Sequence, residues 1–192
     1  MAGDIVNNCN LRCPFCIVDY SNIRGLKLMT PETFRRATEL LPPVPPGNFW
    51  LSCLHEPTMP PRFIEFVESV PAAYRDRISF TTNLCKGLPE DLLERLANSG
   101  VHSIGVSFDS RQPELFAKLR PPARYEVFEQ DLVRLAGFLK TSRRRPRLRF
   151  ISIAFKGNRT ELPGLVRPPG VGGRQPRGAL HVLHAAPGTL GA

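Results

Sequence analysis

Residues 78–109 read ISFTTNLCKGLPEDLLERLANSGVHSIGVSFD, and this stretch indicates how the chain folds. Residues 78–82 are mostly β-branched and aromatic, as in a strand. Pro89 then opens a helical pattern, and residues 101–108 alternate as a second strand. The leucines that share one face of the helix are Leu92, Leu93 and Leu96. Strand, helix and strand in this order are typical of a βαβ unit with parallel strands.

The same alternation continues on both sides of this unit. Further strands are expected at residues 5–6, 49–54 and 148–155, and further helices at residues 30–41, 63–70 and 125–140. Consecutive parallel strands are joined by right-handed crossovers. The five strand patterns and their helices therefore predict an α/β fold with a parallel sheet, which is open or curls toward a partial TIM barrel.

The composition is that of an ordinary globular chain. Its 192 residues are 42% hydrophobic and 22% charged, which suits one domain with a substantial core. No stretch approaches the roughly 20 apolar residues of a membrane span, and the N-terminus lacks the pattern of a secretory signal. We therefore expect a cytoplasmic protein with no membrane partner. Five cysteines, three of them close together, favour thiol chemistry or metal binding over disulfides.

The net charge of +9 is concentrated in two places. Five arginines lie within residues 143–149, and three more lie in a C-terminal segment without acids: Arg167, Arg174 and Arg177. The rest of the chain is nearly balanced. No aromatic side chains are interleaved with the run at residues 143–149, as a surface for stacking bases would require. Nucleic acid is therefore not an expected partner.

Polar residues follow the predicted strands at the points where the strands end. They are Cys9, Glu56, Asn83, Asp109 and Asn158. A parallel sheet would collect them at its C-terminal edge, where α/β folds place their chemistry. Taken singly, each could be a turn or cap residue, but their shared location next to a cysteine cluster favours a functional site.

The cysteine cluster lies in the stretch CNLRCPFC, residues 9–16. Thiolates are soft ligands that select iron-sulfur clusters, zinc or copper. Closed zinc or cluster sites use four protein ligands, and three are local here. A fourth ligand from elsewhere would make a structural site, and the candidates are Cys53, Cys85, His55 and His102. Alternatively, the fourth position is left open for a substrate or cosubstrate, as catalytic metal sites commonly arrange.

The spacing of Cys9, Cys13 and Cys16, with Phe15 before the last cysteine, resembles the cluster loop of the radical S-adenosylmethionine (radical SAM) superfamily. The resemblance implies a radical SAM fold, a 4Fe-4S cluster held by the three cysteines, and S-adenosylmethionine chelated to the fourth iron. It also implies reductive cleavage to a 5'-deoxyadenosyl radical, an oxidoreductase-like reaction that abstracts hydrogen from an unknown peptide or small molecule. The electron donor would be a flavodoxin or a ferredoxin.

The resemblance extends to further positions. Residues 54–57 occupy the place of the family's Gly-Gly-Glu-Pro segment, which contacts the methionine amino group. Here Glu56 and Pro57 are kept, and Leu54 and His55 replace the glycines. The positions that resemble the family's polar contacts to the methionine and ribose are Thr82, Asn83, Ser107 and Asp109. Phe15 would lie near the adenine.

The likeness covers roughly residues 4–166, and the composition changes at that point. We assign residues 1–166 to an incomplete radical SAM core of about five βα units. Residues 167–192 are rich in Gly, Pro, Ala and Arg and are expected to form a disordered tail. We hypothesise that the reading frame is broken near residue 167. The alternative to an enzyme is a noncatalytic module with a structural zinc or closed iron-sulfur site.

Overall fold

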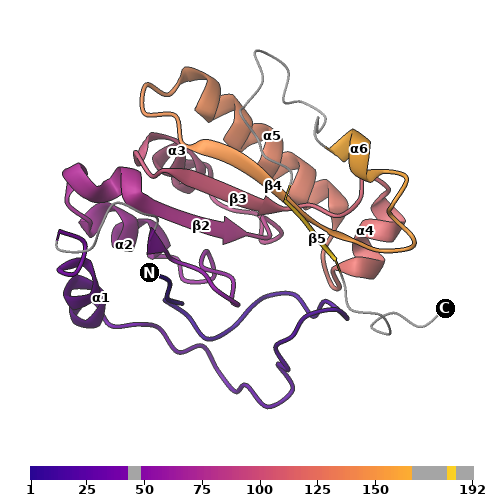
Figure 1. Ribbon diagram of the computed structural model, residues 1–192, viewed down its shortest axis with the longest axis horizontal. Helices are drawn as coiled ribbons and strands as arrows, with labels where there is room; N and C mark the ends of the chain where they lie inside the picture. The colour runs from indigo at the N-terminus through magenta and orange to yellow at the C-terminus, as the bar shows by residue number, and fades with distance from the viewer. Residues whose placement is uncertain (43–48, 166–180, 185–192) are drawn as a thin grey trace.

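The computed structural model describes residues 1–42 and 49–165, together with the backbone of residues 181–184 (Figure 1). The basic residues Arg167, Arg174 and Arg177, and with them most of the segment 167–192, lie outside the described residues. Within the described part of the chain, no helix has both the length and the apolar character needed to cross a lipid bilayer.

The described strands form one parallel sheet, and their order in space is their order in the chain. The strands are β1 (Phe49–Trp50), β2 (Ile78–Thr82), β3 (Ser103–Ser107), β4 (Arg147–Ala154) and β5 (His181–His184). Each pairs in parallel with the next. Because the order of these strands does not reverse, right-handed crossovers place the connecting helices on the same face, as in a TIM barrel. The predicted α/β fold with a parallel sheet is confirmed.

Helices follow the strands and cover one face of the sheet (Figure 1). They are α1 (Pro31–Thr38), α2 (Phe63–Ser69), the 3-10 helix η1 (Ala72–Arg77), α3 (Glu90–Asn98), α4 (Pro113–Leu119), α5 (Tyr125–Thr141) and α6 (Leu162–Leu165). The N-terminus of α1 is capped as its sequence indicates, because the Thr30 side chain accepts a hydrogen bond from the Thr33 backbone N–H at 3.1 Å. Helix α4 was not predicted. It is one of the shorter helices, and its apolar pattern is too brief to stand out.

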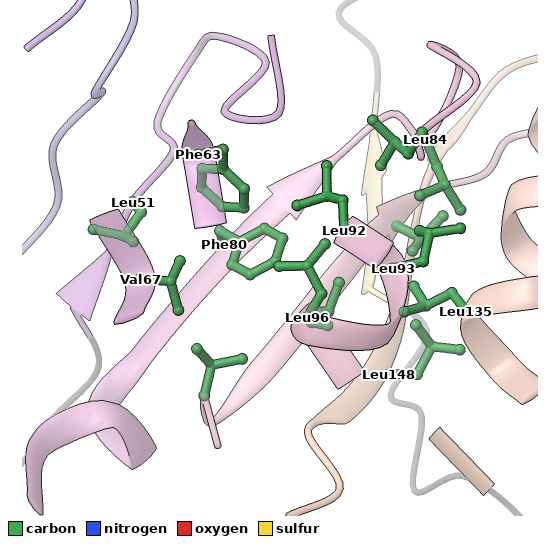
Figure 2. Packing of buried hydrophobic residues seen from close by; sticks show 14 of the residues in the cluster. Leu51, Phe63, Val67, Phe80, Leu84, Leu92, Leu93, Leu96, Leu135 and Leu148 are labelled. Carbon is green, nitrogen blue, oxygen red and sulfur yellow. The ribbon is translucent and has the colours of Figure 1, made fainter. Parts of the chain in front are cut away.

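The hydrophobic core lies between the sheet and these helices (Figure 2). Phe80 of β2 is fully buried and meets Phe63 of α2 edge to face, with the ring centroids 5.0 Å apart. Leucines from α3, α5 and β4 complete this layer: Leu92, Leu93, Leu96, Leu135 and Leu148. The leucines that the sequence placed on one helical face are therefore the ones that the core buries.

The residues of β2 that alternate with Phe80 are polar. The Ser79 hydroxyl accepts a hydrogen bond from the Ser103 hydroxyl of β3 at 2.9 Å, and Thr81 lines a cavity on the face opposite the helices. Gly105 of β3 lies beside Thr81, where an added Cβ would come within 2.9 Å of the threonine hydroxyl oxygen. The sheet thus has one apolar face for the core and an opposite face on which β2 and β3 present small polar residues and β4 presents Ile151 and Ile153.

Replacing Phe80 by alanine should lower the free energy of unfolding by about 3–5 kcal/mol, because it removes a buried ring and leaves a cavity against Phe63. Chemical denaturation monitored by circular dichroism measures the change. The matched control is Thr81→Ala on the opposite face of the same strand, for which about 1 kcal/mol or less is expected. Equal losses in the two variants would contradict the assignment of the core to the helical face.

The predictions differ from the structure in three further places. The strand expected at residues 49–54 is limited to β1, Phe49–Trp50, and just beyond it the Ser52 hydroxyl accepts from the Thr81 N–H of β2 at 2.7 Å. Residues 5–6 do not form a strand: Val6 makes a single antiparallel bridge with Leu28, while Ile5 is buried and its carbonyl accepts from the Met29 N–H at 2.8 Å. The run is too short to form a ladder before the cysteine loop begins. The fifth strand of the sheet is β5, which lies within the segment assigned to a disordered tail. Residues 181–184 were expected to be disordered but form a strand paired with β4, and their apolar Val-Leu pair suits a strand.

Candidate functional site

A cavity of about 400 Å³ lies among the cysteine loop and the C-terminal ends of the strands. The side chains that the sequence assigned to a cluster or to a cosubstrate and that line this cavity are Cys9, Cys13, Phe15, Cys16, Glu56, Thr82, Asn83 and Ser107. Pro57 and Asp109 were assigned to the same site but do not line the cavity. Of the candidates for a fourth metal ligand, Cys53 and His55 line it, whereas Cys85 and His102 do not.

The cysteine loop is held by short hydrogen bonds within itself and to a distant loop. The Asn8 side chain accepts from the Cys9 N–H at 2.8 Å, and the Cys13 carbonyl accepts from the Cys16 N–H at 2.9 Å. The guanidinium of Arg12 donates to the Cys9 carbonyl at 2.6 Å. The backbone N–H of Arg12 donates to the Pro121 carbonyl, also at 2.6 Å. The backbone thus brings three cysteines to one cavity.

Two of the three motif thiols, those of Cys9 and Cys13, are partly buried, whereas Cys16 is exposed. Burial raises the pKa of Cys9 to about 11, and burial also raises the pKa of Cys13, against the opposing effect of the Arg120 charge. The Cys9 sulfur accepts hydrogen bonds from the Leu11 N–H at 3.4 Å and the Asn83 amide at 3.5 Å. Such donors are characteristic of sulfurs that hold iron-sulfur clusters, whose potentials depend on them. The Cys9 environment therefore fits a bound metal cluster.

Glu56 is buried and its carboxylate is fully engaged by the protein. One oxygen accepts from the Thr58 N–H, the Thr58 hydroxyl and the Thr82 hydroxyl at 3.1, 2.6 and 2.7 Å, and the other accepts from the Asn83 N–H at 2.7 Å. Burial raises the pKa of Glu56, and these four bonds oppose the rise. Glu56 thereby joins the loop after β1 to the end of β2, next to the neighbouring Asn83 side chain.

Asp109 is fully buried behind the cavity lining. Its carboxylate forms an ion pair with Arg120 at 2.5 Å and accepts from the Ile153 N–H at 2.8 Å. Asn158 is part of the same network, because its amide donates to the Asp109 carbonyl at 2.8 Å and the Ile153 carbonyl at 2.9 Å. Asp109 and Asn158 therefore connect the ends of β3 and β4 and hold an arginine at the site.

Arg120 is a site residue that the sequence did not reveal. It follows α4, is only 6% exposed, and lines the cavity with its guanidinium carbon 5.7 Å from the centroid of the Phe15 ring. Its Nε is buried and has no hydrogen-bond partner among the described residues. A helix ending in Arg-Pro-Pro gives no local signal of function. What marks this arginine is its ion pair with Asp109, in which the side chains of both partners are buried.

The chain matches known proteins in the regions that build this cavity. The sequence profile of the Radical SAM superfamily matches residues 4–136. A probable GTP 3',8-cyclase of Methanocaldococcus jannaschii is 30% identical over 115 residues, which are 60% of this chain and 38% of that protein. A GTP 3',8-cyclase of Acaryochloris marina is 31% identical over 125 residues, 60% of this chain and 35% of that protein. The chain therefore spans well under half of the length of these relatives.

Solved structures share the fold at low sequence identity. HydG, a maturase of the FeFe-hydrogenase, superimposes with a TM-score of 0.65 at 15% identity, covering 97% of this chain and 42% of that one. Methylornithine synthase (PylB) superimposes with a TM-score of 0.64 at 15% identity, covering 97% of this chain and 53% of that one. The structure of anSMEcpe with bound AdoMet superimposes with a TM-score of 0.62 at 16% identity, covering 79% of this chain and 42% of that one. These likenesses confirm the predicted partial barrel, and the profile match shows that the chain belongs to the radical SAM superfamily.

Proposed function

We propose that Cys9, Cys13 and Cys16 hold a 4Fe-4S cluster and that S-adenosylmethionine binds beside it in the same cavity. The observation that carries the proposal is the convergence of the three motif cysteines with a buried arginine on one cavity. When bound and reduced, such a cluster supplies the electron that cleaves S-adenosylmethionine to a 5'-deoxyadenosyl radical, which abstracts hydrogen from a substrate.

The thiols suit a cluster in number, and all three line the same cavity. A cubane takes one thiolate per iron, so three cysteines would bind three different irons. Within the described ranges, no three His, Cys, Asp or Glu residues surround a position for one metal ion. The alternative of a structural zinc site requires four donors around one ion, which makes it distinguishable by metal content.

The remaining lining residues suit the parts of S-adenosylmethionine. Arg120 offers a cation at the cavity wall to the methionine carboxylate, for which a guanidinium is a well-matched donor. Phe15, which packs on Phe155 with ring centroids 4.8 Å apart, offers an apolar surface to the adenine. Ser107 offers a hydroxyl to the ribose. In this assignment Asp109 acts by holding Arg120 rather than by contacting the cosubstrate.

The partners follow from this chemistry. Cleavage consumes one electron at a time, so we propose a one-electron donor such as a flavodoxin or ferredoxin. Cluster assembly needs reduced thiols, which suits a cytoplasmic location. The substrate is a small molecule or a peptide, and the relatives named as GTP 3',8-cyclases favour the small molecule.

Anaerobic reconstitution with iron and sulfide tests the proposal. The reconstituted chain, given S-adenosylmethionine and a strong reductant, should release 5'-deoxyadenosine and methionine, measured by liquid chromatography with mass detection. Omitting the reductant provides the control, because cleavage without an electron source would point to a different reaction. Tight zinc binding with no cluster uptake would instead support the structural metal site.

A further inference from the structure

The loop that leads into the site after β1 is clamped by one carboxylate. Asp4 accepts hydrogen bonds from three successive backbone N–H groups, those of Cys53, Leu54 and His55, at 2.8, 3.2 and 3.3 Å. The bonds to Cys53 and Leu54 are exposed and the bond to His55 is half-buried, and three N–H groups that converge on one carboxylate restrain the backbone that carries them. The direction in which the His55 side chain leaves the loop is therefore set by Asp4.

The imidazole of His55 lines the cavity together with the three cysteines, and one of its nitrogens is already engaged. Nδ1 lies 3.1 Å from the Tyr20 hydroxyl, which also lies 3.2 Å from the Leu54 carbonyl. When the Tyr20 hydroxyl donates its hydrogen bond to the Leu54 carbonyl, which can only accept, its oxygen is free to accept from Nδ1–H of His55. In that tautomer Nε2 carries a lone pair, which is the form of imidazole that binds metals.

Tyr20 also links His55 to the cysteine loop. Its ring is buried, at 6% exposure, and the guanidinium carbon of Arg12 lies 4.7 Å from the ring centroid. Arg12 in turn donates to the Cys9 carbonyl at 2.6 Å. Metal-binding histidines commonly have their second ring nitrogen held in this way by a neighbouring group, which orients the ring and raises its basicity.

We propose that His55 is a displaceable fourth ligand of the cluster. This rests on the proposed function: the cysteines hold three irons, and Nε2 of His55 coordinates the fourth while S-adenosylmethionine is absent. If the cluster is bound, S-adenosylmethionine would replace the imidazole of His55 on that iron with its own amino and carboxylate groups. The exchange would transfer no electron, and the imidazole would be released neutral beside the Tyr20 hydroxyl.

Two consequences distinguish this role from a structural one. The iron would be protected from solvent and stray ligands before the cosubstrate arrives. S-adenosylmethionine would bind less tightly than to an iron without a fourth ligand, because the bond between His55 and the iron would have to break first. Among the other candidates for the fourth ligand, Cys53 lines the cavity, whereas Cys85 and His102 do not, so Cys53 is the competing ligand that the experiment has to test.

Pulsed electron paramagnetic resonance of the reduced cluster tests the proposal directly. Protein grown with ¹⁵N-histidine and reconstituted anaerobically should show a ¹⁵N coupling without S-adenosylmethionine, and the coupling should disappear when it is added. In His55→Gly, which restores the residue type found in the family's motif, the coupling should be absent from the start. Equilibrium binding to this variant should be tighter than to the wild type by about threefold or more.

Tyr20→Phe is the matched variant for the tautomer. It keeps the ring packing under Arg12 but removes the hydroxyl, so the coupling should weaken while the iron and sulfide content stays at the wild-type value. Cys53→Ser should leave the coupling unchanged. A fully assembled wild-type cluster without any histidine coupling would overturn the ligand role of His55 and leave the three-cysteine cluster standing. A coupling that survives in His55→Gly would overturn it as well, and failure of all variants and the wild type to assemble a cluster would overturn both proposals.

Discussion

Replacing Cys13 by alanine should abolish cluster assembly, with iron and acid-labile sulfide falling to background and the visible charge-transfer absorption lost. Cys13 is one of three thiols from a single loop, and two thiolates are not sufficient to retain the cluster. The variant should still fold, because Cys13 lies at the edge of the core and is half-buried. Iron and sulfide analysis after anaerobic reconstitution, with circular dichroism of the apo form, measures both properties.

Cys53→Ala is the matched control for this prediction. Cys53 is exposed, lies outside the motif, and should be replaceable with no loss of iron or sulfide. Full iron and sulfide in Cys13→Ala would refute the ligand assignment. Loss in both variants would mean that the cluster needs a fourth cysteine and that its site is closed.

Replacing Arg120 by methionine should weaken binding of S-adenosylmethionine by roughly 10- to 100-fold, the effect of losing a hydrogen bond to a charged group of about 1.5–3 kcal/mol. The same variant should also lose stability. Removing Arg120 leaves the Asp109 carboxylate buried without its charge partner, and breaking a buried pair in this way costs about 3–5 kcal/mol. Binding titrations on the reconstituted protein and denaturation of the apo form measure the two effects separately.

The double variant Asp109→Asn/Arg120→Met separates binding from folding. The asparagine can still accept from the Ile153 N–H and carries no buried charge, so most of the lost stability should return. The affinity for S-adenosylmethionine should remain low, because the guanidinium is still missing. If affinity recovers together with stability, Arg120 serves the fold and does not contact the cosubstrate.

Local sequence patterns predicted the order of the helices and strands and the part of the site that lies in the cysteine loop. The βαβ pattern of residues 78–109 became β2, α3 and β3, because its leucine spacing and strand alternation are properties of short segments. Cys9, Cys13, Phe15 and Cys16 lie in one loop, so their shared cavity follows from their proximity in the chain. Asn83 follows a strand end, and its side chain does reach the Cys9 sulfur.

The residues that the sequence could not assign owe their roles to contacts across the fold. Arg120 is placed by Asp109, eleven positions earlier, and Tyr20 is placed by its contact with His55, thirty-five positions later. The family resemblance implies that Asp109 contacts the cosubstrate, and in the structure its carboxylate pairs with Arg120 and accepts from the Ile153 N–H. A position at a strand end predicts that a side chain lies near the site. Its hydrogen-bond partners decide whether it can contact a ligand or instead holds another residue of the site in place.

Mössbauer spectroscopy of the ⁵⁷Fe-reconstituted wild-type protein, before and after addition of S-adenosylmethionine, tests most directly whether one iron of the cluster binds the cosubstrate. We expect one iron of the cubane to change its isomer shift and quadrupole splitting on addition, while the three irons held by Cys9, Cys13 and Cys16 do not. A spectrum that stays the same for all irons in the presence of saturating S-adenosylmethionine would contradict it.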